Sequence, residues 1–237
     1  VKVQLSCFCS TGKSGQHSGR RIEVRDPHRY NAEGRSKTAA MEKKKKSVKD
    51  RIVSAAWELF YEKGYDSTTV DDIIRLSDTS KGSFYYYFDG KDALLNTLSS
   101  VLDDLYLTLK EEMDPYMDSF EKLMFLNYRS HTFMEKTIKV DLLASLYSTQ
   151  LISKGERSLL DQNREYYKLI ASVIEEGQKR GEINRRKSIA EVVKYYSLCE
   201  RALVTDWCLN KGSYSLGEYS KEYMPIMMES FRGKQLS

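Results

Sequence analysis

Apolar residues recur with helical spacing from Ser47 to near the end of the chain. In the first periodic segment they follow one another every three to four residues, at Val48, Ile52, Ala55, Ala56, Leu59 and Phe60. This spacing places them on one face of a helix, and the segment ends at Gly64, a residue typical of helix C-termini. The pattern predicts a helix over residues 47–63.

Two shorter helical patterns follow before residue 90. Thr69 and Asp72 resemble a capping box, with Asp in place of the usual Glu, at the start of a short helix that ends near Asp78. Ser80 is placed to begin a third helix over residues 81–88. Two short helices joined by so brief a turn predict a helix-turn-helix.

Helical patterns also account for the rest of the chain. A long fourth helix after Lys91 is predicted to stop at Asp114-Pro115, because proline lacks a backbone donor and disfavours helix at the residue before it. Further helices are predicted over residues 117–136, 139–152, 157–180, 188–211 and 215–231. The last two begin with capping-box patterns at Ser188 and Ser215. The expected fold class is all-α, with about nine helices.

Composition is that of an ordinary globular protein, 41% hydrophobic and 30% charged, with a mean hydropathy of −0.57. Beyond residue 40 only Pro115 and Pro225 interrupt the chain with proline, which suits long helices. No apolar run approaches the ~18 residues of a membrane span, so we expect no membrane partner. The four cysteines lack the spacing of a zinc site or a disulfide framework. We therefore expect reduced thiols, a cytoplasmic protein, no metal and no cofactor.

The basic surplus lies in the N-terminal tail. Residues 1–40 carry eight Lys and Arg against three Asp and Glu, residues 41–95 ten against ten, and residues 96–237 twenty against twenty-one, which together give the net charge of +4. The tail shows neither a helical nor a strand period, so we expect a disordered extension. Because the first methionine is Met41, we expect residues 1–40 to lie upstream of a working start at that position.

Three segments carry a resemblance to a known family. They are Thr68-Thr69-Val70-Asp71-Asp72-Ile73, Thr79-Ser80-Lys81-Gly82-Ser83-Phe84-Tyr85-Tyr86-Tyr87-Phe88 and Lys91-Asp92-Ala93-Leu94-Leu95. In this order they resemble the DNA-binding segment of TetR-family transcriptional regulators. The resemblance implies an N-terminal three-helix helix-turn-helix DNA-binding domain at residues 41–91. It also implies a C-terminal helical-bundle ligand-binding and dimerisation domain at residues 92–237.

The turn departs from the family pattern. Where the family commonly carries Ala-Gly-Val, this chain has Ser77-Asp78-Thr79. Asp tolerates the left-handed backbone better than most residues other than glycine, so we expect the turn to persist.

The expected DNA contacts gather at the third predicted helix. Its N-terminus offers a charge, two hydroxyls, free backbone N–H groups and a glycine that lets the backbone approach DNA. The candidates for base-edge contacts are Ser80, Lys81, Gly82 and Ser83. The resemblance implies contacts with phosphates or thymine methyl groups from Thr69, Tyr85, Tyr86, Tyr87 and Lys91. Phe84 and Phe88 are expected in the core, and one of the three tyrosines is expected to face inward.

A lysine run precedes the first helix and includes Lys45 and Lys46. Its position predicts an arm over the DNA backbone or in the minor groove. A solvated flank is the alternative.

The second domain is expected to hold a dimer seam and an effector pocket. Apolar positions cover roughly half the circumference of the eighth predicted helix, which favours burial against both its own chain and a partner. The seam candidates are Tyr195, Leu198, Ala202, Leu209, Tyr219, Tyr223 and Met227. The pocket candidates are Tyr106, Met113, Met117, Phe120, Met124, Tyr128, His131, Tyr147 and Tyr167. Plain core packing within a monomer is the alternative for both sets.

The expected function is sequence-specific transcriptional regulation. The chain would act as a homodimeric repressor, released from a palindromic operator in double-stranded DNA by a small apolar or amphipathic effector. A nucleoid-associated or adaptor protein that uses the same fold without an effector is the alternative. An enzyme is not expected, because the sequence contains no HExxH motif, complete phosphate loop or nucleophile elbow.

Overall fold

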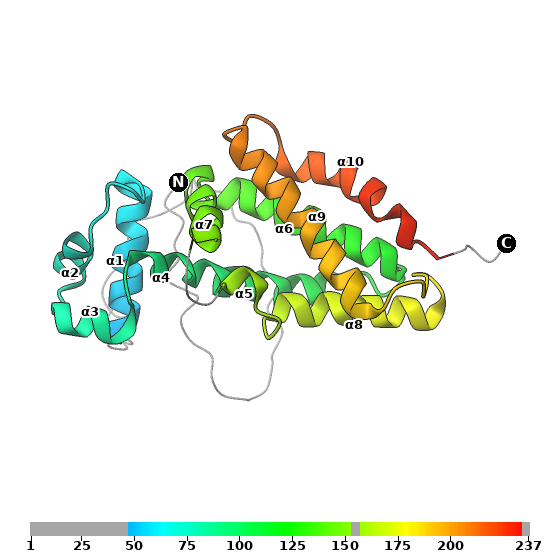
Figure 1. Ribbon diagram of the computed structural model, residues 1–237, viewed down its shortest axis with the longest axis horizontal. Helices are drawn as coiled ribbons and strands as arrows, with labels where there is room; N and C mark the ends of the chain where they lie inside the picture. Colours follow the sequence, from blue (N-terminus) through cyan, green and yellow to red (C-terminus); the bar gives the residue numbers. More distant parts are fainter. Residues whose placement is uncertain (1–46, 153–156, 234–237) are drawn as a thin grey trace, which may run out of the picture.

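The computed structural model describes residues 47–152 and 157–233, and their regular structure is helical apart from one isolated bridge between Ile183 and Arg232 (Figure 1). The α-helices are α1 (Val48–Lys63), α2 (Val70–Ser77), α3 (Lys81–Tyr87), α4 (Lys91–Leu95), α5 (Thr97–Glu112), α6 (Ser119–Thr137), α7 (Val140–Ile152), α8 (Glu165–Arg180), α9 (Ile189–Leu209) and α10 (Leu216–Met228). Two short 3-10 turns are η2 (Ser158–Leu160) and η3 (Glu229–Phe231). The expected all-α fold class is confirmed.

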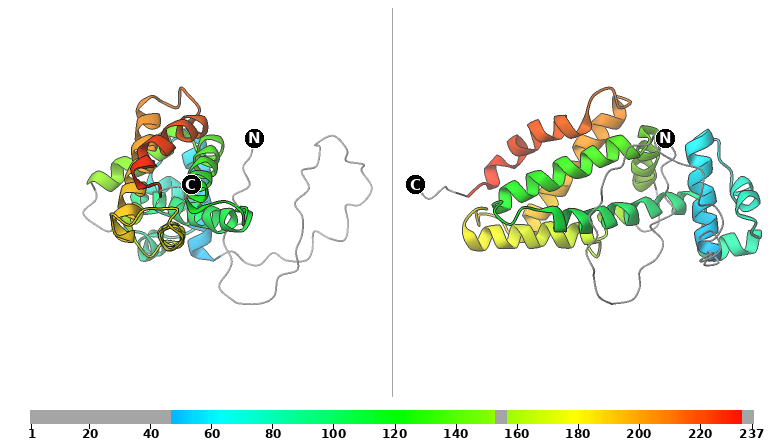
Figure 2. Two further views of the ribbon diagram at one scale, coloured as in Figure 1. Left: turned by 90° about the vertical axis from the view of Figure 1, so that its right-hand side faces the viewer. Right: turned by 180° about the vertical axis from the view of Figure 1, so that it is seen from behind.

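The helices form a small unit at one end of the molecule and a longer bundle at the other (Figures 1 and 2). Helices α1–α3 make the small unit, and α4 leads from it into α5. In the bundle, α6 packs along α10, and α8 packs against α5, α6 and α9. Across residues 47–152 and 157–233, no helix has both the length and the apolar character needed to cross a membrane.

The small unit closes around one apolar core. Ile52 and Phe60 of α1, Ile73 of α2 and Phe84 of α3 are fully buried, and Phe88 is buried beside them. Burial of a side chain of this size contributes about 1.5–3 kcal/mol. The expected core positions of Phe84 and Phe88 are confirmed, and the opposite face of α3 remains open to solvent.

Capping residues set the helix starts in this unit. The Thr69 hydroxyl accepts a hydrogen bond from the Asp72 N–H at 3.1 Å, while the Asp72 carboxylate accepts one from the Thr69 N–H at 3.0 Å. At α3, Ser80 Oγ accepts from the Ser83 N–H at 3.1 Å. Both starts lie where the sequence pattern predicts them.

The predicted long fourth helix is divided at Asn96 into α4 and α5. Asn96 Oδ1 accepts hydrogen bonds from Gln150 Nε2 and Ser158 Oγ, both at 3.0 Å. These partners lie in α7 and η2, far along the chain, while at the break itself Thr97 Oγ1 donates to the Leu94 carbonyl at 2.6 Å and Ser99 Oγ donates to the Asn96 carbonyl. The prediction of an uninterrupted helix is wrong at this residue.

One of the two capping boxes predicted near the C-terminus is complete. Ser188 and Glu191 exchange both hydrogen bonds. Ser215 Oγ accepts from the Glu218 N–H at 3.3 Å, but the Glu218 carboxylate accepts from Tyr128 at 3.0 Å instead of returning to Ser215. Tyr128 of α6 thus donates to the Glu218 carboxylate, where a complete capping box would have the Ser215 N–H as the donor.

Candidate DNA-binding face and ligand cavity

The first turn of α3 combines occupied hydroxyls with an open backbone. Ser80 Oγ and Ser83 Oγ lie 2.9 Å apart, so both are engaged in the cap. Lys81 and Gly82 are exposed. A Cβ placed on Gly82 would meet only Ser80 Oγ, at 3.9 Å, which is ordinary contact. The packing of this chain therefore does not require a glycine in the helix, whereas close approach of another molecule would.

The turn before α3 is held by a left-handed aspartate. Asp78 has φ 50° and ψ 55°, and its N–H donates to the carbonyls of Arg75 and Ile74. Arg51 Nη1 of α1 donates to the Asp78 carbonyl at 3.1 Å. The expectation that Asp sustains this turn is confirmed, and the turn fixes α3 relative to α1 and α2.

Three tyrosines line the outer side of α3. Tyr85, Tyr86 and Tyr87 are 48%, 79% and 41% exposed, and the rings of Tyr86 and Tyr87 meet edge to face with centroids 4.8 Å apart. The expectation that one of them faces inward is wrong, because Phe84 and Phe88 already fill the core side of this segment. Phenol groups in this position offer hydroxyl donors and ring faces to a partner.

Lys91 at the start of α4 is engaged within the chain. Its ammonium donates to the carbonyls of Tyr65 at 3.0 Å, Asp66 at 3.4 Å and Thr68 at 3.2 Å, and it lies 4.3 Å from the centroid of the Tyr65 ring. The Tyr65 hydroxyl donates to Asp92. Lys91 thus ties α4 to the loop between α1 and α2, and its predicted phosphate contact stays a prediction.

Of the other predicted contacts, Thr69 is the N-cap residue of α2. Thr69 is exposed, but its hydroxyl serves the cap of α2. Hydrogen bonds from Lys63 and Thr69 hold the pKa of the Asp72 carboxyl well below its usual range. Lys45, Lys46 and the extension 1–40 lie outside the described residues.

A small cavity of about 50 Å³ lies between α5, α6, α7, η2, α8 and α9. Of the pocket residues predicted from sequence, it brings together Tyr106, His131 and Tyr147. Tyr167 does not line the cavity. Its hydroxyl donates to the carbonyl of the lining residue Leu159 at 2.9 Å. The structure places the remaining candidates away from this cavity: Met113, Met117, Phe120, Met124 and Tyr128.

Charged side chains that the sequence reasoning missed also line the cavity. Glu200 is buried and accepts hydrogen bonds from the Tyr166 hydroxyl and from Asn127 Nδ2, the latter at 3.2 Å. Burial raises the pKa of the Glu200 carboxyl. Arg164 and Arg201 face the same space. Helical spacing could have predicted that Glu200 is buried, because it lies four residues after Tyr196 on the buried face of α9.

His131 is a buried neutral group at the cavity wall. Burial lowers the pKa of its imidazole to about 3, and Nδ1 pairs with Ser220 Oγ of α10. The ring therefore links α6 to α10.

Apolar and aromatic side chains remain exposed along α9 and α10. On α9 the predicted seam residues Tyr195, Leu198, Ala202 and Leu209 are exposed, Leu209 to 77%. On α10 Tyr223 is exposed, whereas Tyr219 and Met227 are half-buried.

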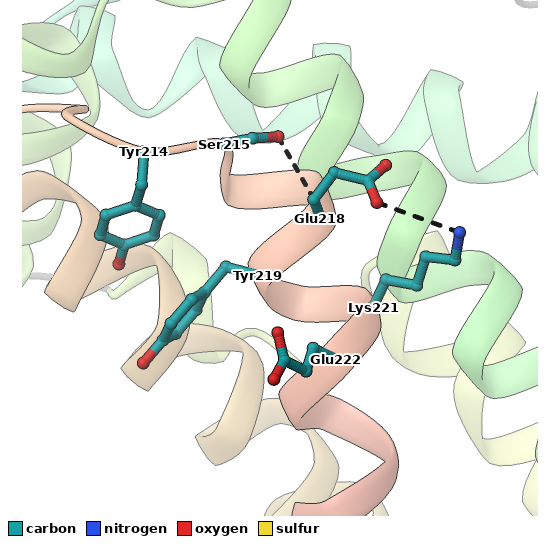
Figure 3. A pocket seen from close by; sticks show the side chains of 6 residues that line it. All are labelled: Tyr214, Ser215, Glu218, Tyr219, Lys221 and Glu222. Carbon is teal, nitrogen blue, oxygen red and sulfur yellow. Dashed lines mark hydrogen bonds and ion pairs between the residues drawn. The ribbon is translucent and has the colours of Figure 1, made fainter.

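An open groove runs beside this surface along α10. Figure 3 shows its lining, with the Tyr214 and Tyr219 rings on one side of α10 and Glu218 paired with Lys221 on the other. The rings of Tyr214, Tyr219 and Tyr223 follow one another at centroid distances of 4.8 and 4.3 Å. The result is an aromatic row on the outside of the bundle.

Comparison with known proteins gives consistent matches. The family described as "Bacterial regulatory proteins, tetR family" matches residues 52–98. The HTH-type transcriptional regulator QacR of Staphylococcus aureus (strain Mu50) is 27% identical over 153 residues, which cover 62% of this chain and 80% of QacR. The HTH-type transcriptional repressor KstR2 of Rhodococcus jostii (strain RHA1) is 26% identical over 188 residues, or 78% of this chain and 91% of KstR2.

Solved structures agree at the level of the fold. FadR from Bacillus subtilis in complex with stearoyl-CoA has a TM-score of 0.60 at 20% identity, covering 77% of this chain and 98% of FadR. FadR from Thermus thermophilus in complex with lauroyl-CoA also has a TM-score of 0.60, at 21% identity, covering 78% of this chain and 95% of that protein. At this identity the likeness shows a shared fold.

Proposed function

Because the chain belongs to the TetR family of transcriptional regulators, we propose that it acts as a homodimeric repressor that binds a palindromic operator through α3 and is released by a small-molecule effector. The observation that carries the proposal is the exposed face of α3. There Lys81 and an unpacked Gly82 precede three exposed tyrosines, while the same helix buries Phe84. This arrangement suits the entry of a recognition helix into the major groove.

The exposed residues of α9 and α10 support the homodimer. Side chains such as Leu198 and Leu209 are costly to leave in water when they form a continuous patch. A second copy related by a two-fold axis would cover the same surface on both chains. Such a dimer holds two α3 helices apart at a fixed spacing, which is what recognition of a palindrome requires.

The cavity in the bundle supports effector control. It lies between α5 and α9, and α5 continues through α4 to the helix-turn-helix domain (Figure 1). A ligand that fits one position of these helices better than another would shift their equilibrium and thereby change DNA affinity.

Selection of random duplex DNA by the full-length protein at near-physiological salt tests the proposal. We expect an enriched palindrome. The double variant Lys81→Ala/Tyr85→Ala should lose this enrichment, while the matched control Lys136→Ala/Tyr116→Ala, which alters exposed residues of the bundle, should retain it. Binding that follows only salt concentration, without sequence enrichment, would instead favour the nucleoid-associated or adaptor function.

A further inference from the structure

The cavity contains hydrogen-bond donors that the protein leaves largely unused. Within the described part of the chain, the Arg201 guanidinium makes one hydrogen bond, a long one of 3.4 Å from Nη1 to the Tyr167 hydroxyl, and no ion pair. The Tyr147 hydroxyl has no hydrogen-bond partner in the same ranges, although the ring lines the cavity. A guanidinium carries five N–H donors, so most of the capacity of Arg201 remains available.

The second arginine of the cavity is already neutralised. Arg164 Nε donates to both carboxylate oxygens of Asp103, at 3.2 and 3.1 Å, and Nη2 donates to the Ser99 carbonyl at 3.2 Å. Of the two arginines, Arg201 is therefore the one whose guanidinium has no ion pair among the described residues.

The carboxyl group in the cavity already accepts hydrogen bonds from the protein. The two carboxyl oxygens of Glu200 accept from Tyr166 and Asn127. Burial raises the pKa of the Glu200 carboxyl, while its hydrogen bonds and the neighbouring Arg201 act in the opposite direction. A cationic ligand would have to displace these donors, whereas an anionic one would meet donors that are free.

We propose that this cavity binds an amphipathic carboxylic acid, whose carboxylate pairs with the Arg201 guanidinium and accepts a hydrogen bond from the Tyr147 hydroxyl. Arginine and a carboxylate have matching planar geometry for paired hydrogen bonds. The apolar part of the ligand would contact Leu102, Met134 and Val204, which line the same space. The inference rests on the proposed function and specifies the chemistry of its effector.

The size of the cavity links binding to movement. At about 50 Å³ the cavity is well below the roughly 300–1,000 Å³ of typical ligand pockets. Any carboxylic acid with an apolar body must therefore widen the cavity. Leu159 of η2 forms part of the wall. Its N–H donates to Gln150 Oε1, its carbonyl accepts from the Tyr167 hydroxyl, and its side chain packs against the core. Ligand entry is expected to displace η2.

Thermal-shift and calorimetric titrations of the full-length protein test this inference. The probes are hexanoate, 3-phenylpropionate and cyclohexanecarboxylate, each beside the primary alcohol and the primary amine of the same skeleton. The variants are Arg201→Met and Tyr147→Phe, and the control is Arg186→Met, which removes an exposed arginine between α8 and α9.

We expect carboxylates to bind in preference to the matched alcohols and amines. Arg201→Met should weaken their binding about ten- to hundredfold, Tyr147→Phe should weaken it several-fold, and Arg186→Met should leave it unchanged. Tyr147→Phe retains the ring, so it tests the donor even if Arg201→Met fails to fold.

Three results would overturn the inference: preferential binding of the amines, carboxylate binding that survives both cavity variants, or no carboxylate binding by the wild-type protein. Selection of duplex DNA by the same preparations separates this inference from the proposed function. A protein that enriches a palindrome but binds no carboxylate contradicts only the effector chemistry. Carboxylate binding without an enriched palindrome contradicts the DNA-binding proposal and leaves the ligand site in place.

Discussion

Asn96 Oδ1 accepts a hydrogen bond from Gln150 Nε2 at 3.0 Å, and this contact joins the junction of α4 and α5 to the end of α7. The same Gln150 side chain accepts the Leu159 N–H through Oε1 at 3.3 Å, and Leu159 lines the cavity. Ser158 donates to Asn96 as well, at 3.0 Å. The cavity wall and the helix that enters the DNA-binding domain are thus connected by consecutive hydrogen bonds.

Asn96→Ala is expected to weaken the effect of a ligand on DNA affinity. The substitution removes the acceptor shared by Gln150 and Ser158, so displacement of η2 would no longer act on the α4–α5 junction. The expected loss of coupling is about 0.5–2 kcal/mol. Fluorescence anisotropy of the selected operator, with and without the tightest-binding carboxylate, measures it. The control is Asn163→Ala, an exposed loop residue, and equal ligand responses in the two variants would contradict this route.

Gly82→Ala is expected to lower operator affinity without lowering the stability of the protein. Alanine is favoured over glycine by about 0.8–1 kcal/mol in a helix interior, which is an upper bound for Gly82 in the first turn of α3, and the new methyl group would meet nothing closer than Ser80 Oγ at 3.9 Å. The variant should therefore melt at the same or a higher temperature while its operator affinity falls. Circular dichroism melts and operator titrations measure the two quantities. Unchanged operator affinity would show that α3 does not approach DNA closely at this residue.

Leu198→Glu is expected to disrupt self-association. Leu198 is 53% exposed on α9, and a carboxylate there would be buried without a partner in a dimer. Association should weaken at least about tenfold, or ~1.4 kcal/mol. Sedimentation velocity over a range of concentrations measures it. Leu107→Glu is the matched control, because Leu107 is 45% exposed on α5, away from this surface. A monomeric wild-type protein, or equal effects of both variants, would exclude the α9–α10 seam.

The features that could be predicted from the sequence depend on contacts between residues that are close in the chain. The starts of α2 and α3 depend on side chains within three residues of the cap, such as Thr69 with Asp72, and these were predictable. The left-handed turn at Asp78 is likewise a property of one residue and its neighbours.

Long-range contacts explain what could not be predicted. Asn96 at the break accepts hydrogen bonds from Gln150 and Ser158, and Glu218 of the incomplete box accepts one from Tyr128, so both features involve residues distant in the sequence. The cavity gathers residues from six elements, so Tyr106 and Tyr147 were predictable as aromatic candidates but their association with Arg201 was not.

Lys91→Met is expected to lower the stability of the protein by about 1–3 kcal/mol. The substitution leaves three backbone carbonyls of the α1–α2 loop without their ammonium donor. Urea unfolding followed by circular dichroism measures the change, and Lys136→Met, at an exposed position of α6, is the control. Weakened DNA binding with unchanged stability would mean that Lys91 acts as a phosphate contact and not as a positioning residue.

His131 is expected to make stability depend on pH. Its folded-state pKa of about 3 lies below the ordinary value of 6.5, so below pH 6.5 the unfolded chain binds a proton that the folded chain excludes. The stabilising contribution is present above pH 6.5 and is lost as the pH falls toward 3, by up to ~1.4 kcal/mol per pH unit. Urea unfolding of the wild type and of His131→Gln between pH 7 and pH 4 compares the slopes. Equal slopes would contradict the prediction.

If two copies of the chain bind one palindrome through α3, scrambling one half-site should weaken binding. The full-length protein is titrated against the selected duplex and against the same duplex with one half-site scrambled, and stoichiometry is measured in parallel. We expect two chains on each intact duplex and a loss of affinity of at least about tenfold when one half-site is scrambled. Equal affinity for both duplexes, or one chain on each duplex, would contradict it.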